Sequence, residues 1–311
     1  EQLLLDGKRC TGVTYSRGGQ HTAAKVTREV ALSAGTIGSP QILELSGIGQ
    51  PELLQAHGIA VHHELPAVGE YFRDHMMARV QWCIAKAGVS YNERVRGLGL
   101  VVQALKYAAS GSGFLSLPSA PLVAFVKTRP ELATPDVQMH IVPYAVKNPK
   151  RRKLHSFAGM TIASYQLRPE SLGSTHIRSA YPAMQPAIRF NFLADPVDRE
   201  TTVETVRIAR RLVAAPPMDA FRGAEYSPGA EVDTDDAIEA WIRENSETSY
   251  HPIGSCRMGP DAVVNERLQV HGIKGLRVAD ASIFPTMPSG NTNAPAIMVG
   301  EKAADLIRET T

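Results

Sequence analysis

The fold is decided by residues 29–49, which read Glu29-Val-Ala-Leu-Ser-Ala-Gly-Thr-Ile-Gly-Ser-Pro-Gln-Ile-Leu-Glu-Leu-Ser-Gly-Ile-Gly49. Residues 25–32 are a strand candidate that ends in Ser33-Ala34-Gly35. Ser39 followed by Pro40 predicts the N-cap and first turn of a short helix through residue 45, and Gly47 predicts its end. Small residues at such a joint let the backbone approach a ligand or another backbone closely, and they serve equally well as plain turns. A strand, a small-residue turn and a helix in succession are typical of α/β folds.

On either side of this stretch, turn residues and apolar patterns predict further short elements. Strands are expected over residues 3–5, 12–15, 137–142, 160–165, 176–179 and 276–279, those of the middle region being half-buried and antiparallel. Helices are expected between Pro51 and Gly58, over residues 98–109, over 196–214 after an Asp195 cap, over 234–243 after Asp233, and from Pro295 onward. The chain therefore divides into regions 1–75, 76–248 and 249–311, the middle one a sheet with helices beside it.

Composition describes a globular chain with enough apolar residues for a large core. It has 311 residues, 43% of them hydrophobic, and a net charge of +2, which fits one or two domains and gives no overall basic field. The basic run Lys147–Lys153 is interpreted as a solvated loop, so no nucleic-acid partner is expected. An odd number of cysteines (Cys10, Cys83 and Cys256) without CxxC spacing indicates neither a zinc site nor a disulfide framework, and favours a reducing, cytoplasmic location. Since no apolar run approaches ~20 residues, no membrane span is expected.

Two side chains are candidates for chemistry, His251 in His251-Pro-Ile-Gly-Ser-Cys-Arg-Met-Gly259 and Asn291 in Gly290-Asn-Thr-Asn-Ala-Pro295. Imidazole suits proton transfer because its basicity lies near working pH. A residue before proline favours an extended backbone, so Pro252 restricts the direction in which the His251 side chain leaves the backbone. Asn291 sits near a helix start, where unpaired N–H groups favour an approaching anion.

Each candidate also has a simpler interpretation. A lone histidine is more often a satisfied core or surface residue, and Asn291 or Asn293 could be no more than a helix cap. Cys256 lies five residues after His251 and could form a Cys–His nucleophile, but a buried small hydrophobic residue is the favoured interpretation.

Five stretches in the same order resemble the glucose–methanol–choline (GMC) flavin oxidoreductases, and their residues are most similar to the choline-dehydrogenase-like branch. The resemblance covers nearly the whole chain and is carried by residues 29–49, Leu65-Pro-Ala-Val-Gly69 with Arg73-Asp-His75, Tyr250–Gly259, Gly275–Ser282 and Gly290–Pro295.

The resemblance implies a fold and a chemistry. Regions 1–75 and 249–311 would form part of an FAD-binding Rossmann-like domain, and region 76–248 a substrate-binding domain. An alcohol would give its α-hydrogen as hydride to flavin N5 while His251 takes the hydroxyl proton and Asn291 donates a hydrogen bond to the oxygen. By motif position, the cofactor contacts would be Ala34, Gly35, Asp280, Ala281, Asn291, Thr292 and Asn293. Asp280 serves equally well as a cap of the next turn.

One departure from the family pattern is large, because no Gly-rich dinucleotide turn follows a first strand; Gly97-Leu-Gly99 lacks the third glycine. The N-terminal half of the same protein is therefore an expected partner, either as a separate chain or missing, and this chain alone should not hold FAD tightly. The expected substrate is a primary alcohol, and the electron acceptor is oxygen, a quinone or another carrier. A lyase of the hydroxynitrile type with His251 as base, and a non-catalytic fragment, remain open alternatives.

Overall fold

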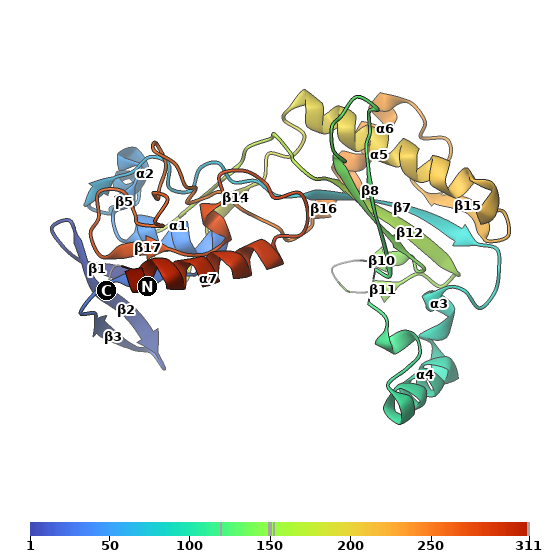
Figure 1. Ribbon diagram of the computed structural model, residues 1–311, viewed down its shortest axis with the longest axis horizontal. Coiled ribbons are helices and arrows are strands. Elements are labelled where there is room, and N and C mark those ends of the chain that lie inside the picture. The colour runs from blue at the N-terminus through green and yellow to red at the C-terminus, as the bar shows by residue number, and fades with distance from the viewer. Residues whose placement is uncertain (119, 149–150, 152, 310–311) are drawn as a thin grey trace. The chain divides into compact units, whose positions relative to one another are not determined.

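The computed structural model describes residues 1–118, 120–148, 151 and 153–309, and it confirms a mixed α/β chain (Figure 1). Parts of the basic run, Pro149, Lys150 and Arg152, lie outside the described residues. Two compact units are formed, one by Glu1–His75, Arg168–Asp195 and Tyr250–Thr311, the other by Met76–Leu167 and Pro196–Ser249. The expected middle region 76–248 is thus not one block, since residues 168–195 belong to the first unit.

Backbone hydrogen bonds explain why residues 168–195 group with the first unit. Phe72 and Gly173 exchange two of them, Phe72 N–H to Gly173 O at 3.1 Å and Gly173 N–H to Phe72 O at 2.7 Å. Thr175 N–H donates to the Gly69 carbonyl at 2.7 Å. The residues from 176 to 179, expected as a strand of the middle sheet, are instead mostly loop after β13 (Ser174–His176), which pairs with β14 (Ala187–Arg189).

The first unit is built on a parallel pair, β4 (Val30–Leu32) beside β17 (Leu276–Val278). Of the strand expected over residues 25–32, only residues 30–32 form β4, which joins β17. Lys25 ends β3 (Gln20–Lys25), which continues the hairpin of β1 (Gln2–Asp6) and β2 (Arg9–Arg17), and residues 26–29 form no strand. The sequence pattern did not separate the two strands, which belong to different sheets. β3 is exposed throughout, whereas β4 buries Val30 and Leu32. Further elements of this unit are β5 (Ile48–Gly49), α2 (Pro51–Ala56), β6 (His63–Glu64), the 3-10 helix η3 (Ala281–Ile283) and α7 (Asn293–Glu309).

Helix α1 (Gly35–Leu45) starts four residues before the predicted Ser39, and Pro40 lies inside it. Proline removes the N–H that would bond the carbonyl of Thr36. That carbonyl instead accepts a hydrogen bond from Ser255 Oγ at 2.5 Å. Ser39 still acts as a cap, but from within the helix, because its hydroxyl accepts from the Ala34 N–H at 3.2 Å. The predicted end is confirmed: the helix stops at Leu45, and Gly47 follows with φ +75°.

The second unit is a six-stranded antiparallel sheet with helices packed on it. Its strand order is β15-β7-β12-β9-β8, with β16 also paired to β7. Its elements are β7 (Met76–Ile84), α3 (Tyr91–Arg94), α4 (Gly97–Ser110), η1 (Phe114–Ser116), β8 (Leu122–Val126), β9 (Val137–Val142), β10 (Val146–Asn148), β11 (Lys153–Leu154), β12 (Gly159–Gln166), α5 (Pro196–Ala214), η2 (Pro216–Met218), β15 (Arg222–Ser227), α6 (Asp235–Asn245) and β16 (Glu247–Thr248).

The sheet and its covering helix follow the predicted pattern closely. Strand β9 and helix α5 match the expected ranges, and α5 packs on β12 and β7. Strand β12 was expected to be half-buried, but all eight of its residues are buried. Helix α6 is capped by Thr234, whose hydroxyl accepts from the Ala237 N–H, rather than following Asp233 directly. Among the described residues, no helix combines the length and apolarity required to cross a bilayer.

A carboxylate–imidazole cluster fastens residues 168–195 to α1. Glu44, whose side chain is fully buried, lies with its Oε1 2.6 Å from His176 Nδ1, and its Oε2 accepts the Ile177 N–H at 2.8 Å. Glu70 Oε1 lies 3.2 Å from the other ring nitrogen. Burial lowers the pKa of His176, but the hydrogen bond and charge of Glu44, aided by Glu70, outweigh burial and raise that pKa above its usual value.

This raised pKa predicts how stability depends on pH. Protonated His176 stabilises the fold fully below the unfolded-state pKa, and the contribution is lost as pH rises through the higher folded-state pKa. The free energy of unfolding of the native protein should therefore exceed that of a His176→Asn variant most at mildly acidic pH. The gap should shrink by about 1 kcal/mol toward alkaline pH, the difference between hydrogen bonds to charged and to neutral groups. Urea titrations at several pH values measure it, and a gap that widens with pH would contradict the assignment.

Candidate active site

A short antiparallel contact holds the backbone of His251. Arg73 and Ile253 exchange two hydrogen bonds, Arg73 N–H to Ile253 O at 3.1 Å and Ile253 N–H to Arg73 O at 2.9 Å. His251 lies two residues before Ile253, and its backbone N–H donates to Oδ1 of Asp74, the residue after Arg73, at 3.0 Å. Asp74 thus anchors the backbone at the histidine itself.

The two predicted catalytic side chains converge. Asn291 Nδ2 lies 3.1 Å from His251 Nε2, although the residues are 40 positions apart in sequence. On the other side of the ring, His251 Nδ1 lies 3.1 Å from His75 Nδ1, and the two imidazole planes are nearly perpendicular at 87°. His75 is fully buried, His251 is partly exposed and Asn291 is exposed. The arrangement leaves Nε2 of His251 and the amide of Asn291 on the accessible side of the pair.

Asn291 stands two residues before α7, which begins at Asn293 and not at the predicted Pro295. The discrepancy is small because a first-turn proline loses no helical hydrogen bond. The carbonyl of Thr292 accepts the Ala296 N–H at 3.0 Å and so begins the helical hydrogen bonds, and Thr292 is buried while Asn293 is exposed.

Asp280 fastens the starts of two helices. One oxygen accepts the Gly35 N–H at 3.0 Å and the Ser39 hydroxyl at 2.6 Å, and the other accepts the Ser282 N–H at 2.8 Å. The capping alternative foreseen for this residue is therefore present in the structure. Asp280 connects the end of β17 to the first turn of α1, so that Ala281 begins η3 beside that turn.

The start of α1 is open on one side. Gly35 has φ +78°, and a Cβ built on it would have no heavy atom within 4 Å. Ala34 is exposed beside it. This glycine is not required by packing against the described chain, so space remains for a group that approaches its backbone.

Cys256 belongs to the core and not to the chemistry. Burial, aided by the negative charge of Asp280, raises the pKa of its thiol well above the usual range. Its N–H donates to the Ser282 carbonyl at 2.9 Å and its side chain lies in the apolar cluster of the first unit. The structure therefore supports the interpretation of Cys256 as a small hydrophobic residue over that of a Cys–His nucleophile.

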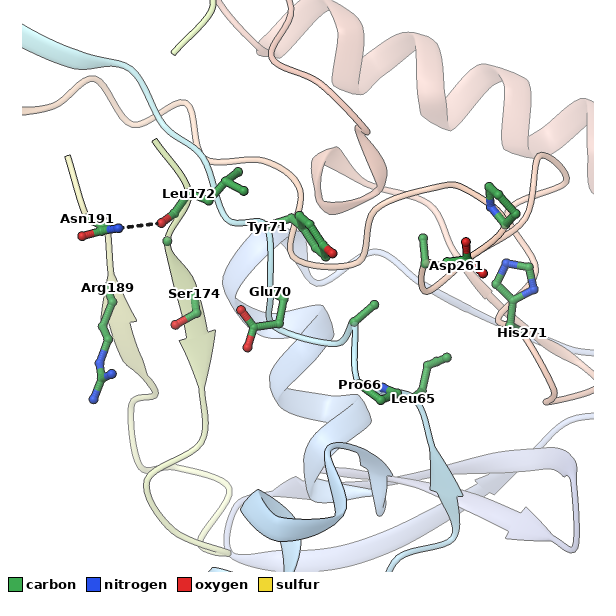
Figure 2. Close-up of a pocket in the computed structure, with 14 residues that line it drawn as sticks. Leu65, Pro66, Glu70, Tyr71, Leu172, Ser174, Arg189, Asn191, Asp261 and His271 are labelled. Atoms are coloured by element: carbon green, nitrogen blue, oxygen red, sulfur yellow. Dashed lines mark hydrogen bonds between the residues drawn. The ribbon is translucent and has the colours of Figure 1, made fainter. Parts of the chain in front are cut away.

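A cavity of about 1160 Å³ also opens in the first unit, but neither His251 nor Asn291 lines it (Figure 2). Its wall includes Leu65, Tyr71 and Arg189. Asn191 Nδ2 donates to the Leu172 carbonyl at 3.0 Å, and a dashed line marks this hydrogen bond in Figure 2. The predicted catalytic pair therefore lies outside this cavity.

Asp74 and His75 were not singled out from sequence. The only available signal was their place in Arg73-Asp-His75, directly after the Leu65–Gly69 stretch. Nothing in the sequence shows that this segment runs beside residues 251–253, which lie about 180 positions later.

Comparisons with known proteins identify the family that this chain resembles. Residues 1–77 and 169–300 match two family models, each described as GMC oxidoreductase. Oxygen-dependent choline dehydrogenases of Photobacterium profundum and Serratia proteamaculans are 38% and 39% identical over 100% of this chain, covering 55% and 56% of those proteins. The chain thus spans little more than half the length of these relatives.

Solved structures show the same fold. A formate oxidase of Aspergillus oryzae, solved as an R554A variant, superimposes with a TM-score of 0.90 at 26% identity, over 99% of this chain and 59% of that one. An FAD-dependent oxidoreductase from Chaetomium thermophilum gives 0.87 at 25% identity, over 99% and 60%. From its two matched segments, its relatives and its fold, we conclude that this chain belongs to the GMC oxidoreductase family.

Proposed function

We propose that this chain forms part of an FAD-dependent enzyme that oxidises a primary alcohol to an aldehyde. The observation that carries the proposal is the 3.1 Å approach of Asn291 Nδ2 to His251 Nε2. The proton acceptor, His251 Nε2, and the hydrogen-bond donor, Asn291 Nδ2, lie together on the solvent-accessible side of the pair. When bound, FAD would accept the α-hydrogen of the alcohol as hydride at N5, chemistry that no side chain supplies.

The residues at the starts of α1 and α7 fit a flavin nucleotide. Open space beside Gly35 and the exposed Ala34 permit close approach to the backbone, and Asn293 is exposed at the first turn of α7. Ala34, Gly35, Ala281, Thr292 and Asn293 would contact the cofactor directly. Asp280 would act by keeping the first turn of α1 in place, since its carboxylate binds the Gly35 N–H and the Ser39 hydroxyl. Helix N-termini favour the negative charge of a phosphate or of a reduced ring.

His251 would act as the base. Neutral imidazole accepts the hydroxyl proton at Nε2, and the Asn291 amide donates to the alcohol oxygen while that proton leaves. An amide cannot take up a proton, so His251 is the sole base of the pair. The hydrogen bond from the backbone N–H of His251 to Asp74 Oδ1 holds the backbone of the base in place.

The substrate and the electron acceptor are proposed only by class. The relatives' name, oxygen-dependent choline dehydrogenase, supports an alcohol substrate and oxygen as one acceptor, and a quinone or other carrier is the second. The N-terminal half of the same protein remains the expected partner that completes the cofactor site, and a cytoplasmic location remains a prediction. Residues 76–167 and 196–249 would provide the substrate-binding domain.

Anaerobic mixing of the holoenzyme with a panel of primary alcohols tests the proposal. Loss of the yellow flavin absorbance would show hydride transfer. Persistence of the colour together with cleavage of a cyanohydrin would show a lyase, and absence of reaction with every alcohol and cyanohydrin would contradict a catalytic role.

Asn291→Ala should lower the rate constant of flavin reduction by an amount equivalent to about 1–3 kcal/mol, the cost of one hydrogen bond to a group that develops charge. Rapid-mixing absorbance measurements give this rate constant. Asn291→Asp is the matched variant, since it preserves size but removes the N–H donors, and it should be at least as slow. A fully active Asn291→Asp enzyme would remove Asn291 from this role.

A further inference from the structure

We propose that His75 is a positioning residue that keeps His251 in the one neutral tautomer able to act as a base. The inference rests on the proposed function and assigns a role to a buried side chain that the reaction itself does not touch. His75 has no exposed surface, and its Nδ1 lies 3.1 Å from His251 Nδ1.

The proton positions follow from the two contacts of the His251 ring. An amide nitrogen can only donate, so the approach of Asn291 Nδ2 assigns Nε2 of His251 as an acceptor without a proton. Neutral His251 must then carry its proton on Nδ1. Only one proton fits between two nitrogens 3.1 Å apart, so His75 Nδ1 is the acceptor and His75 carries its own proton on Nε2.

The contact between His75 Nδ1 and His251 Nδ1 selects between the two neutral tautomers of His251. In one tautomer Nε2 is free to accept the hydroxyl proton, and in the other it already carries a proton and cannot serve as base. By accepting the Nδ1–H, His75 favours the first form. The two nitrogens lie within hydrogen-bonding distance, at 3.1 Å, and the ring planes are nearly perpendicular at 87°.

The same contact serves after proton transfer. His251 then carries N–H groups on both nitrogens, and His75 Nδ1 continues to accept one of them without adding a charge of its own. Asp74, the acidic neighbour of His75, accepts the backbone N–H of His251 through Oδ1. Backbone and ring of the base are therefore fixed by consecutive residues of one segment.

Two substitutions distinguish the effect of the hydrogen-bond acceptor of His75 from the effect of its volume. His75→Asn retains an oxygen near the position of Nδ1 and should keep the rate constant of flavin reduction within about threefold of the native value. His75→Leu fills the space without an acceptor and should lower the rate constant about 10–100-fold, the range found when a group that orients a metal-ligating histidine is removed. The dissociation constant of the alcohol should change little in both.

A second readout does not depend on activity. Nitrogen-15 NMR of histidine-labelled native protein, with the His251 signals identified by their loss in His251→Ala, should show Nδ1 protonated and Nε2 unprotonated. This readout holds even if His75→Leu fails to fold. A protonated Nε2 in the native protein, or full activity in a folded His75→Leu enzyme, would overturn the proposal. An active His251→Ala enzyme would instead contradict the proposed function, so the two failures are distinguishable.

Discussion

Replacement of His251 with alanine is expected to slow flavin reduction by a primary alcohol by about 10²–10⁴-fold, the usual effect of losing a general base. The reason is geometric: Nε2 of His251 is the acceptor atom that Asn291 approaches at 3.1 Å, and Asn291 cannot accept a proton in its place. FAD should stay bound, because the residues proposed to hold it lie in other segments. Anaerobic stopped-flow absorbance measures the rate constant, and the visible spectrum reports the bound cofactor.

His21 provides a matched control. It is an exposed histidine of β3, and its Nδ1 lies 2.9 Å from Glu1 Oε2. His21→Ala should reduce flavin at the native rate. Near-native reduction by His251→Ala would exclude this histidine as the base, and loss of FAD from that variant would show that its role is structural.

The second large effect is expected at Gly254, three residues after His251. Its φ is +92°, and a Cβ there would overlap the carbonyl of Tyr71, which belongs to the segment that carries Asp74 and His75. Gly254→Ala should therefore lower the free energy of unfolding by about 2–5 kcal/mol, from backbone strain and overpacking together. Urea unfolding followed by circular dichroism measures the loss.

Gly58→Ala separates the two contributions. Gly58 has φ +70°, but a Cβ would meet no heavy atom within 4 Å, so only backbone strain of about 1–2 kcal/mol is expected. Equal losses at the two positions would show that Tyr71 yields to the methyl group and that the contact beside His251 is not rigid.

The local sequence pattern was sufficient for elements that lie in a single layer of the fold. Helix α5 and strand β9 each lie in one layer, and their ranges were predicted without error. The prediction failed where distant segments decide the outcome. Pro40 is tolerated inside α1 because Ser255 donates a hydrogen bond to the freed Thr36 carbonyl. Residues 25–32 do not form one strand because β17 pairs only with residues 30–32.

The candidate site shows the same division. Motif position identified His251 and Asn291, and the structure brings them together. It did not identify His75, whose contact with His251 spans 176 positions and depends on the hydrogen-bond exchange between Arg73 and Ile253. For Asp280 the sequence left two roles open, and the hydrogen bonds with Gly35 and Ser39 show the capping role.

The most direct test of the central claim is a crystal structure of the FAD-bound protein with an unreactive alcohol analogue. The account predicts that the analogue's oxygen lies within hydrogen-bonding distance, about 2.7–3.2 Å, of both His251 Nε2 and Asn291 Nδ2, with its α-carbon facing the flavin. An analogue oxygen held by other side chains, or a flavin remote from this pair, would contradict it.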